Sequence, residues 1–155
     1  MSGYLAVKWL HILSSTLLFG TGIGSAFYLL VTTWSKDVRA IASVARTVVW
    51  ADTLFTATTA IVQPVSGFLM VHLAGYPIGT RWIAWSMALY VIAIACWLPV
   101  VWIQVRLRDL AREAVRSDTA LPPAYWRWFR WWLVLGVPAF FAFVAIFWLM
   151  TVKPA

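Results

Sequence analysis

Two histidines are the residues whose type and placement point most directly to chemistry in this sequence. His11 lies within the apolar stretch VKWLHILSSTLLFGTGIG, and His72 lies near the end of a later apolar stretch, shortly before Gly75 and Pro77. Ionisable side chains are expensive in a hydrocarbon environment and usually have a function there. Because neutral imidazole binds metal ions and haem iron, both histidines are candidate metal ligands.

The composition places these histidines in an integral membrane protein. The chain of 155 residues is 63% hydrophobic and 11% charged, whereas soluble domains are about 45–50% apolar and about 25% charged. The mean hydropathy is +0.85. The net charge of +7 is best explained by loops that meet anionic lipid, because no basic and polar domain exists to bind nucleic acid. We therefore expect the lipid bilayer as a partner and no nucleic acid.

Four stretches are long and apolar enough to cross a membrane, which takes about 20 residues. They cover residues of about 4–31, 53–73, 82–105 and 131–152. Because the connections are short apart from the third, sequential spans should be antiparallel neighbours. The sequence predicts an all-α fold, a four-helix up-down membrane bundle that forms a single domain over residues 1–155.

The distribution of Lys and Arg predicts the orientation of the bundle. Cytoplasmic connections of membrane proteins carry an excess of both residues. Here the first and third connections hold nine of the twelve: Lys36, Arg39, Arg46, Arg106, Arg108, Arg112, Arg116, Arg127 and Arg130. We therefore expect both termini on the outer side. Residues 106–116 also have an exposed helical pattern, which predicts that the third helix extends beyond the membrane and ends before Pro122.

The antiparallel arrangement brings the two histidines to a similar depth. At 1.5 Å per residue, His11 lies roughly 10 Å into the first span, and His72 lies within about 5 Å of the same level near the end of the second. Facing helices of bundles hold cofactors in this way. The placement predicts one b-type haem, with His11 and His72 as its axial ligands.

The neighbours of His11 fit a bound macrocycle. Ser15 and Gly22 follow on the same helical face and are small enough to leave space. Lys8 and Arg81 lie toward the outer side, where each could meet a haem propionate. We take these four residues, with the two histidines, as the candidate cofactor site.

Other interpretations of the same residues remain open. An intramembrane histidine can simply form a hydrogen bond between helices, which would fit a cofactor-free assembly or structural subunit. Gly20 and Gly24 form a GxxxG pattern, which permits a homo-oligomer without requiring one. Met70 near His72 is a weak indication of copper.

Three further polar or helix-breaking residues lie in the second span. Asp52 precedes Thr53 at its cytoplasmic start and fits a helix N-cap, with proton uptake or a quinone site as the functional alternative. Gln63 comes directly before Pro64 near mid-membrane. Because proline frees a backbone carbonyl in the preceding turn, we expect the Gln63 amide to satisfy it.

Several stretches resemble a family of predicted bacterial integral membrane proteins that is known only as a domain of unknown function. The matching stretches are KWLH at 8–11, GTGIG at 20–24, QPVSG at 63–67, HLAGYP at 72–77, WLPVVWIQVRLRDL at 97–110, LGVPAF at 135–140 and LMTVKP at 149–154. They cover nearly the whole chain in order. The resemblance implies a multi-pass protein of the bacterial inner (cytoplasmic) membrane, and it brings no activity.

A more distant resemblance concerns the pattern Lys8-x-x-His11-Ile12. It is similar to the first helix of HemJ-type protoporphyrinogen oxidases, which bind haem b, and of CopD-type copper-resistance membrane proteins. The resemblance implies that His11 is a haem ligand, or alternatively that the protein handles copper. The nearest counterpart of a HemJ-type lysine is Arg81, and arginine cannot lose a proton as that lysine must. This departure counts against the oxidase activity but not against the haem. The hypothesis is therefore a small redox component that exchanges electrons with quinone or a partner protein.

Overall fold

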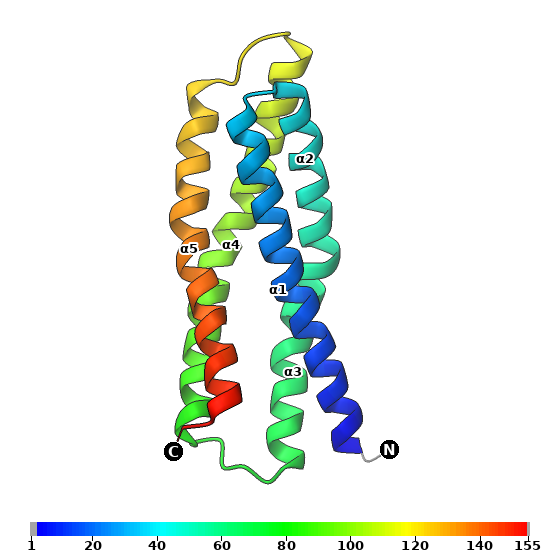
Figure 1. The fold of residues 1–155 in the computed structure, drawn as a ribbon, viewed down its shortest axis with the longest axis vertical. Helices are drawn as coiled ribbons and strands as arrows, with labels where there is room; N and C mark the ends of the chain where they lie inside the picture. The colour runs from blue at the N-terminus through cyan, green and yellow to red at the C-terminus, as the bar shows by residue number, and fades with distance from the viewer. Residues whose placement is uncertain (1–2, 155) are drawn as a thin grey trace.

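The protein is an all-helical bundle in a computed structural model that describes residues 3–154 (Figure 1). Its elements are α1 (Gly3–Ser35), α2 (Val38–Ala51), the π-helical turn η1 (Asp52–Thr56), α3 (Ala57–Leu73), α4 (Arg81–Arg116) and α5 (Pro123–Val152). Because α2, η1 and α3 follow one another without a break, they form one long helix. The predicted four-helix up-down bundle is confirmed.

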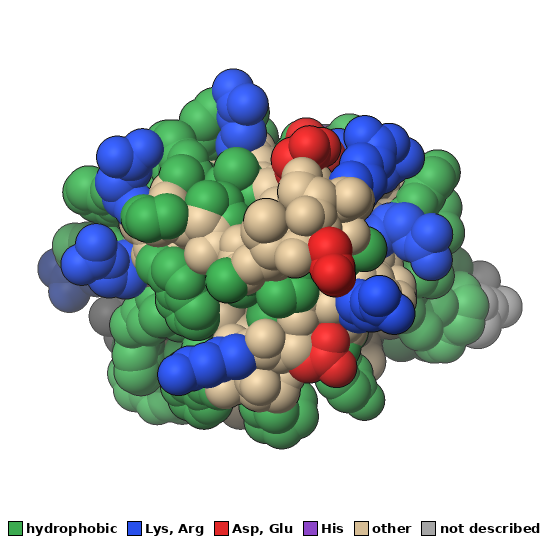
Figure 2. All heavy atoms as spheres, turned by 90° about the horizontal axis from the view of Figure 1, so that it is seen from above, with side chains coloured by type: hydrophobic (Ala, Val, Ile, Leu, Met, Phe, Trp, Pro, Cys, Tyr) green, Lys and Arg blue, Asp and Glu red, His purple; other side chains and the backbone are tan. Residues whose placement is uncertain are grey.

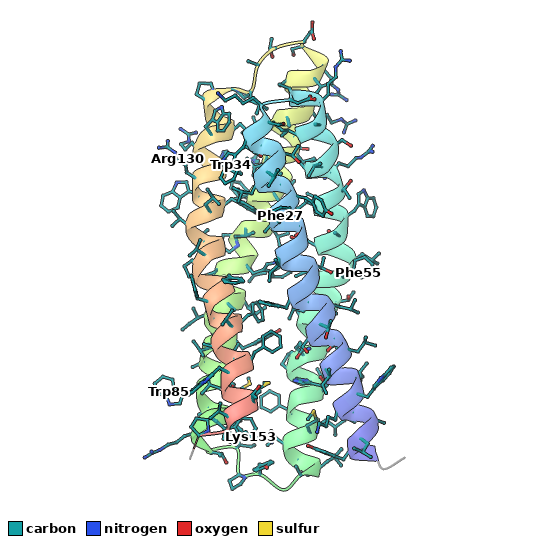
Figure 3. The ribbon with its side chains drawn as sticks, viewed as in Figure 1. Phe27, Trp34, Phe55, Trp85, Arg130 and Lys153 are labelled. Carbon is teal, nitrogen blue, oxygen red and sulfur yellow. The ribbon has the colours of Figure 1, made fainter. Side chains whose placement is uncertain are left out.

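Each of the four long helices is apolar enough to span a membrane. Large apolar side chains are exposed on every helix, and Figure 3 shows Phe27, Phe55 and Trp85 pointing away from the bundle. Helices that are hydrophobic on all sides suit an apolar solvent, and a helix satisfies its own backbone hydrogen bonds there. This surface is the lipid-facing one.

The two ends of the bundle differ in charge. Both termini and the α3–α4 connection lie at one end, here called the terminal end. The α1–α2 and α4–α5 connections lie at the other, where Lys and Arg side chains surround the rim (Figure 2). We call this the basic end; it includes Lys36, Arg39, Arg112, Arg116 and Arg127.

Exposed aromatic residues indicate where the hydrocarbon layer lies. Two exposed aromatic residues mark the layer on each of two helices: Trp9 and Tyr28 on α1, and Trp85 and Trp102 on α4. The two members of each pair are about 25–30 Å of helix apart, which is close to the thickness of a bilayer core. Since α4 has 36 residues, its last turns extend beyond this layer. The basic end therefore projects from the membrane as a helical extension.

The first connection is shorter than the predicted spans suggested. Helix α2 begins at Val38, so Arg39 and Arg46 lie on a helix instead of in a loop. Asp37 is the N-cap, and its carboxylate accepts hydrogen bonds from the backbone N–H groups of Arg39 and Ala40. Hydropathy alone missed α2 because α2 lies largely outside the apolar window. The predicted extension of the third helix is confirmed, since α4 continues to Arg116.

The hydrophobic core is concentrated toward the basic end. Tyr125, Phe129 and Trp132 of α5 stack in succession, and the Tyr125 hydroxyl shares a 3.0 Å hydrogen bond with Thr33 of α1. Side chains of α1, α2 and α4 complete the cluster, among them Leu29, Ile41, Val48, Ile103 and Leu107. Toward the terminal end the helices instead form two pairs, α1 with α3 and α4 with α5.

Candidate functional site

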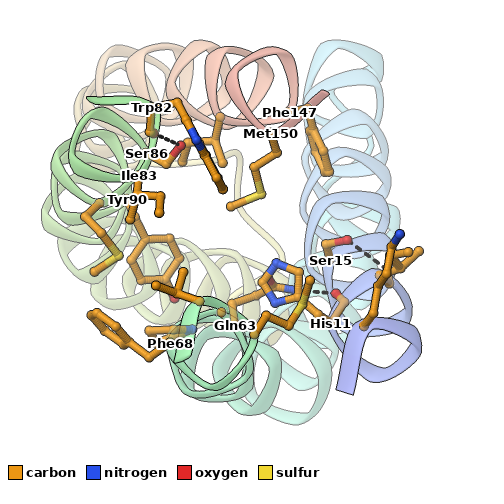
Figure 4. A pocket seen from close by; sticks show the side chains of 18 of the residues that line it. His11, Ser15, Gln63, Phe68, Trp82, Ile83, Ser86, Tyr90, Phe147 and Met150 are labelled. Carbon is orange, nitrogen blue, oxygen red and sulfur yellow. Dashed lines mark hydrogen bonds between the residues drawn. The ribbon is translucent and has the colours of Figure 1, made fainter. Parts of the chain in front are cut away.

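A cavity of about 480 Å³ lies between the α1–α3 pair and the α4–α5 pair in the terminal half of the bundle (Figure 4). Most of its lining is apolar, with polar groups from His11, Gln63, Ser86 and Tyr90. Sites for small molecules and cofactors have this volume and this mixture of an apolar wall with a few placed polar groups. The cavity is therefore the candidate site.

His11 is held at the wall of this cavity in one defined orientation. Its Nδ1 lies 2.8 Å from the Ser66 hydroxyl, and that hydroxyl donates its own hydrogen to the Val62 carbonyl at 2.7 Å. Ser66 must therefore accept, so Nδ1 carries a proton and Nε2 has a free lone pair. Within residues 3–154 the side-chain hydrogen bond of the ring is made by Nδ1, and the ring has a further hydrogen bond to the backbone of Gln63. Gly67 lies directly against this ring, since an added Cβ at that position would be 3.4 Å from His11 Cε1.

Gln63 ties the backbone of α1 to α3 beside this histidine. Its amide Nε2 donates to the His11 carbonyl at 2.9 Å and to the Ser14 hydroxyl at 2.7 Å. His11, Ser14, Gln63 and Ser66 are all buried. The network fixes the rotation of α1 against α3, and sequence reasoning selected neither Ser14 nor Ser66.

Pro64 frees a carbonyl, but Gln63 is not its partner. The proline lacks the N–H that would bond to the carbonyl of Ala60, and the Tyr90 hydroxyl of α4 donates to that carbonyl instead. The prediction that the Gln63 amide takes this role is wrong, because that amide faces α1. Tyr90 thus connects the two helix pairs across the cavity wall.

Two lysines lie at the end of the cavity nearest the termini. Lys8 of α1 and Lys153 both contribute to its lining. Lys153 follows α5 in a left-handed conformation that ends the helix, and its Nζ lies 5.7 Å and 5.6 Å from the ring centroids of Tyr76 and Trp82. The sequence indicated Lys8 but not Lys153, because the turn at residue 153 is not evident from residue types.

The other predicted site residues have different positions. His72 is exposed and lines a separate hollow with Gly75, Tyr76 and Pro77. It follows Gln63 by about two and a half helical turns, so it lies on the opposite face of α3 from the His11 network. The structure therefore does not bring His72 to the cavity that His11 lines.

Only one of the three remaining predicted site residues, Ser15, lines the cavity; Gly22 and Arg81 do not. Ser15 lines it, although its hydroxyl donates to the Ile12 carbonyl of its own helix at 2.8 Å. Arg81 begins α4 as an exposed residue outside the lining. Gly22 also lies outside it, and an added Cβ there would meet nothing within 4 Å.

Methionine sulfur is the donor that sequence reasoning underestimated. Of the four methionines, three line the cavity: Met70 of α3, Met87 of α4 and Met150 of α5. Figure 4 shows Met150 and the His11 ring both extending into the space between the helix pairs. Within residues 3–154 no three His, Cys, Asp or Glu side chains come together, so a metal here would require a mixed set of donors.

Asp52 does not begin a helix as predicted. It lies inside the continuous helix, in η1, and its buried carboxylate accepts hydrogen bonds from Thr56 and Ser25. This long helix begins at Val38, and Asp37 is its N-cap. Asp52 therefore has no free helix N-terminus to cap.

Comparison with known proteins places the whole bundle in one family. The family model described as "Predicted integral membrane protein (DUF2269)" matches residues 5–154. Neither the curated proteins nor the solved structures gave a match. The family match and the four apolar helices agree that the bundle is embedded in a lipid bilayer. The chain belongs to this family of predicted integral membrane proteins.

Proposed function

We propose that the cavity binds one b-type haem, with His11 as an axial ligand, and that the protein is a small redox component of the bacterial cytoplasmic membrane. The observation that carries this proposal is the orientation of His11. Ser66 holds the Nδ1–H, so Nε2 offers its lone pair at the cavity wall. A ligating histidine in a metal site has this arrangement, in which the second nitrogen is fixed by a hydrogen bond.

The rest of the cavity supports the same group. Its apolar wall suits a porphyrin face, and its volume of about 480 Å³ falls within the range of cofactor sites. Lys8 and Lys153 at its end can bind two carboxylates, as the haem propionates require. Lys153 takes the role that the sequence assigned to Arg81.

Met150 is the second ligand in this proposal. His72 lies on the opposite face of α3, whereas Met150 extends into the cavity from α5 on the side facing His11. A histidine–methionine pair is an established form of haem ligation in electron-transfer proteins. The haem supplies one-electron chemistry, and we propose quinone or a partner protein as the electron acceptor or donor.

The experiment is an absorption spectrum of the purified protein, made with ample haem, before and after reduction with dithionite. The proposal expects a low-spin spectrum that is lost in His11→Ala and retained in His72→Ala, which serves as the matched control. In Met150→Leu the haem stays bound but becomes five-coordinate and high-spin. A featureless wild-type spectrum would contradict haem binding and favour a cofactor-free assembly or structural subunit.

Copper handling is a second candidate, because one observation favours it. Thioether sulfur and imidazole together bind Cu(I), and three methionines share the cavity with His11. Elemental analysis of the purified protein separates the two: one copper without iron supports this candidate, and one iron contradicts it. Met87→Leu adds a second test, since it should weaken Cu(I) binding but leave a His11–Met150 haem spectrum unchanged.

A further inference from the structure

A second buried polar cluster lies nearer the basic end, apart from the cavity. Its centre is the carboxylate of Asp52, whose side chain is 3% exposed. Oδ1 of Asp52 accepts hydrogen bonds from Thr56 at 3.0 Å and from Ser25 of α1 at 3.4 Å. The Gln104 side chain of α4 also interacts with this carboxylate. Three helices thus contribute donors to one buried carboxylate.

Among the residues that the structure describes, no cation forms an ion pair with this carboxylate. The two ion pairs within residues 3–154 join Arg108 to Asp109 and Arg116 to Glu113. Between Lys8 and Lys36 α1 has no Lys, Arg, Asp or Glu, and α3 has none at all.

The cations nearest along the neighbouring helices also face elsewhere. Arg46 of α2 is exposed, and Arg106 of α4 is exposed with its guanidinium 5.1 Å from the centroid of the Trp102 ring. Because a buried charge without a counter-ion is costly in this environment, the Asp52 carboxylate depends entirely on the three hydrogen-bond donors.

Gln104 has an oxygen that the structure leaves without a partner. Its Oε1 is buried and makes no hydrogen bond within the described part of the chain, so the contact with Asp52 comes from the amide NH₂. A buried acceptor without a donor is costly and usually indicates a missing group. A protonated Asp52 would supply that missing donor.

The same residues can therefore satisfy both forms of the carboxyl group. When Asp52 is ionised, Ser25, Thr56 and the Gln104 NH₂ donate to it. When it is protonated, a half-turn of the Gln104 amide brings Oε1 to accept from the new O–H, because the two ends of an amide group have nearly the same shape. The Ser25 hydroxyl retains the Gly22 carbonyl as an acceptor, and the Thr56 hydroxyl retains a carboxyl oxygen of Asp52.

The local backbone is unusual at the same place. Asp52 begins a five-residue π-helical turn, which interrupts an otherwise regular helix of α2 and α3. Such turns contain one residue more than an α-turn and occur frequently at functional sites. Asp52 and Thr56, the first and last residues of this turn, share a hydrogen bond and are both buried.

We infer that Asp52 is a reversible proton-binding site, with Gln104 as the partner that changes orientation when the proton binds. The proton comes from hydronium in the water at the basic end and returns to that water, so an O–H bond forms on the carboxyl group as one in hydronium breaks. Asp52 lies about 9 Å of helix from the exposed Arg46, which keeps the site close to that side. The inference does not depend on any ligand in the cavity.

Infrared titration of the full chain in lipid nanodiscs tests this inference. The wild type should show a carboxylic acid C=O band that disappears as the pH rises, together with a change in one glutamine amide band. Asp52→Asn should lack the band. Gln104→Leu should keep a carboxyl band but shift it to the frequency of a more weakly hydrogen-bonded group and lose the amide change. Asp109→Asn, at an exposed carboxylate, is the matched control and should behave as the wild type.

Three results would overturn the inference. One is a carboxyl band that survives in Asp52→Asn, and another is a Gln104→Leu spectrum identical to the wild type. The third is a titration that moves when sodium replaces choline, which would mean that the oxygens of this cluster bind a metal cation. Because Gln104→Leu is read separately, a failure of Asp52→Asn to fold still leaves the test decisive.

Discussion

The two nitrogens of His11 have different surroundings, and this difference makes the residue a candidate ligand. A histidine whose only role is to join two helices needs one hydrogen bond from its ring to the neighbouring helix. Here the Gln63 amide donates hydrogen bonds to the backbone carbonyl of His11 and to the Ser14 hydroxyl, and Nδ1 of the ring donates to the Ser66 hydroxyl. Nε2 is therefore the nitrogen that we propose binds the ligand at the cavity wall.

Removing the Ser66 hydroxyl should weaken ligand binding without removing the ligand atom. In Ser66→Ala the Nδ1–H loses its acceptor and the ring loses its fixed orientation, so we expect the affinity for haem to fall about 10- to 100-fold. Haem titration followed by absorbance measures this. Thr58→Ala, on the exposed side of α3, removes a hydroxyl that bonds only to its own helix and should leave the affinity unchanged. Equal losses in the two variants would contradict the proposed orientation.

Tyr90 and Pro64 should be energetically coupled. Tyr90→Phe leaves the Ala60 carbonyl without a donor, at a cost of about 0.6–2 kcal/mol in the free energy of unfolding. In a Pro64→Ala background the helix supplies its own N–H to that carbonyl, so the same change should cost much less. Denaturation in mixed detergent micelles gives all four free energies of this double-mutant cycle. Strict additivity would show that the hydroxyl serves another purpose.

At the scale of the element, the long helix from Val38 to Leu73 carries two polar clusters, one within η1 and the other in α3. Asp52 and Thr56 face Ser25 and Gln104, while Gln63 and Ser66 face His11 and Ser14. A regular α-helix of the same length would rotate one cluster relative to the other. The π turn therefore decides which residues of α3 reach the cavity.

Deleting one residue at two places in this helix separates the role of η1 from that of α3. Removal of the lipid-facing Leu54 should turn the π turn into an α-turn, so Gln63 and Ser66 keep facing α1 and only the Asp52–Thr56 contact changes. Removal of Ile61, equally lipid-facing, should rotate the following residues by about 100° and break the His11 network. Thermal unfolding in detergent should show a much lower midpoint for the second deletion. A larger loss for the first would contradict this assignment.

The whole molecule combines a packed basic end with a hollow terminal half. Aromatic and aliphatic side chains fill the space between the helices near the basic end, where the helices extend beyond the hydrocarbon layer. Toward the terminal end the two helix pairs separate around the cavity, whose residues come from four helices. The cavity therefore lies where the helix pairs separate, and the packed cluster lies where α1, α2, α4 and α5 meet.

The orientation of this molecule in the membrane is directly testable. The distribution of Lys and Arg predicts that the basic end is cytoplasmic and both termini are outside. In a Cys96→Ala background, Gly79→Cys in the α3–α4 connection should react with a membrane-impermeant maleimide in intact bacterial cells. Ser117→Cys after α4 should react only once the cells are opened. The reverse pattern would invert the topology and place the His11 cavity toward the cytoplasm.

The sequence by itself determined the class and the outline of this protein. Long apolar stretches must form helices in lipid because only a helix satisfies every backbone polar group within one segment, so four spans and an all-α bundle follow from hydropathy alone. The extension of α4 followed from its charge pattern, and His11 was identified because an ionisable residue is rare at that depth. These properties depend on residues close together in the chain.

Only the tertiary structure decided which side chains meet. Hydropathy does not fix how a uniformly apolar helix is rotated, so it did not reveal that His72 faces away from His11 or that Met150 and Lys153 share the cavity with it. A single π turn also rotates all the following residues of the helix about its axis, and the residue types in η1 did not predict such a turn. The partners of His11 and Asp52 come from distant helices, and their positions are set by packing between helices, which no local pattern records.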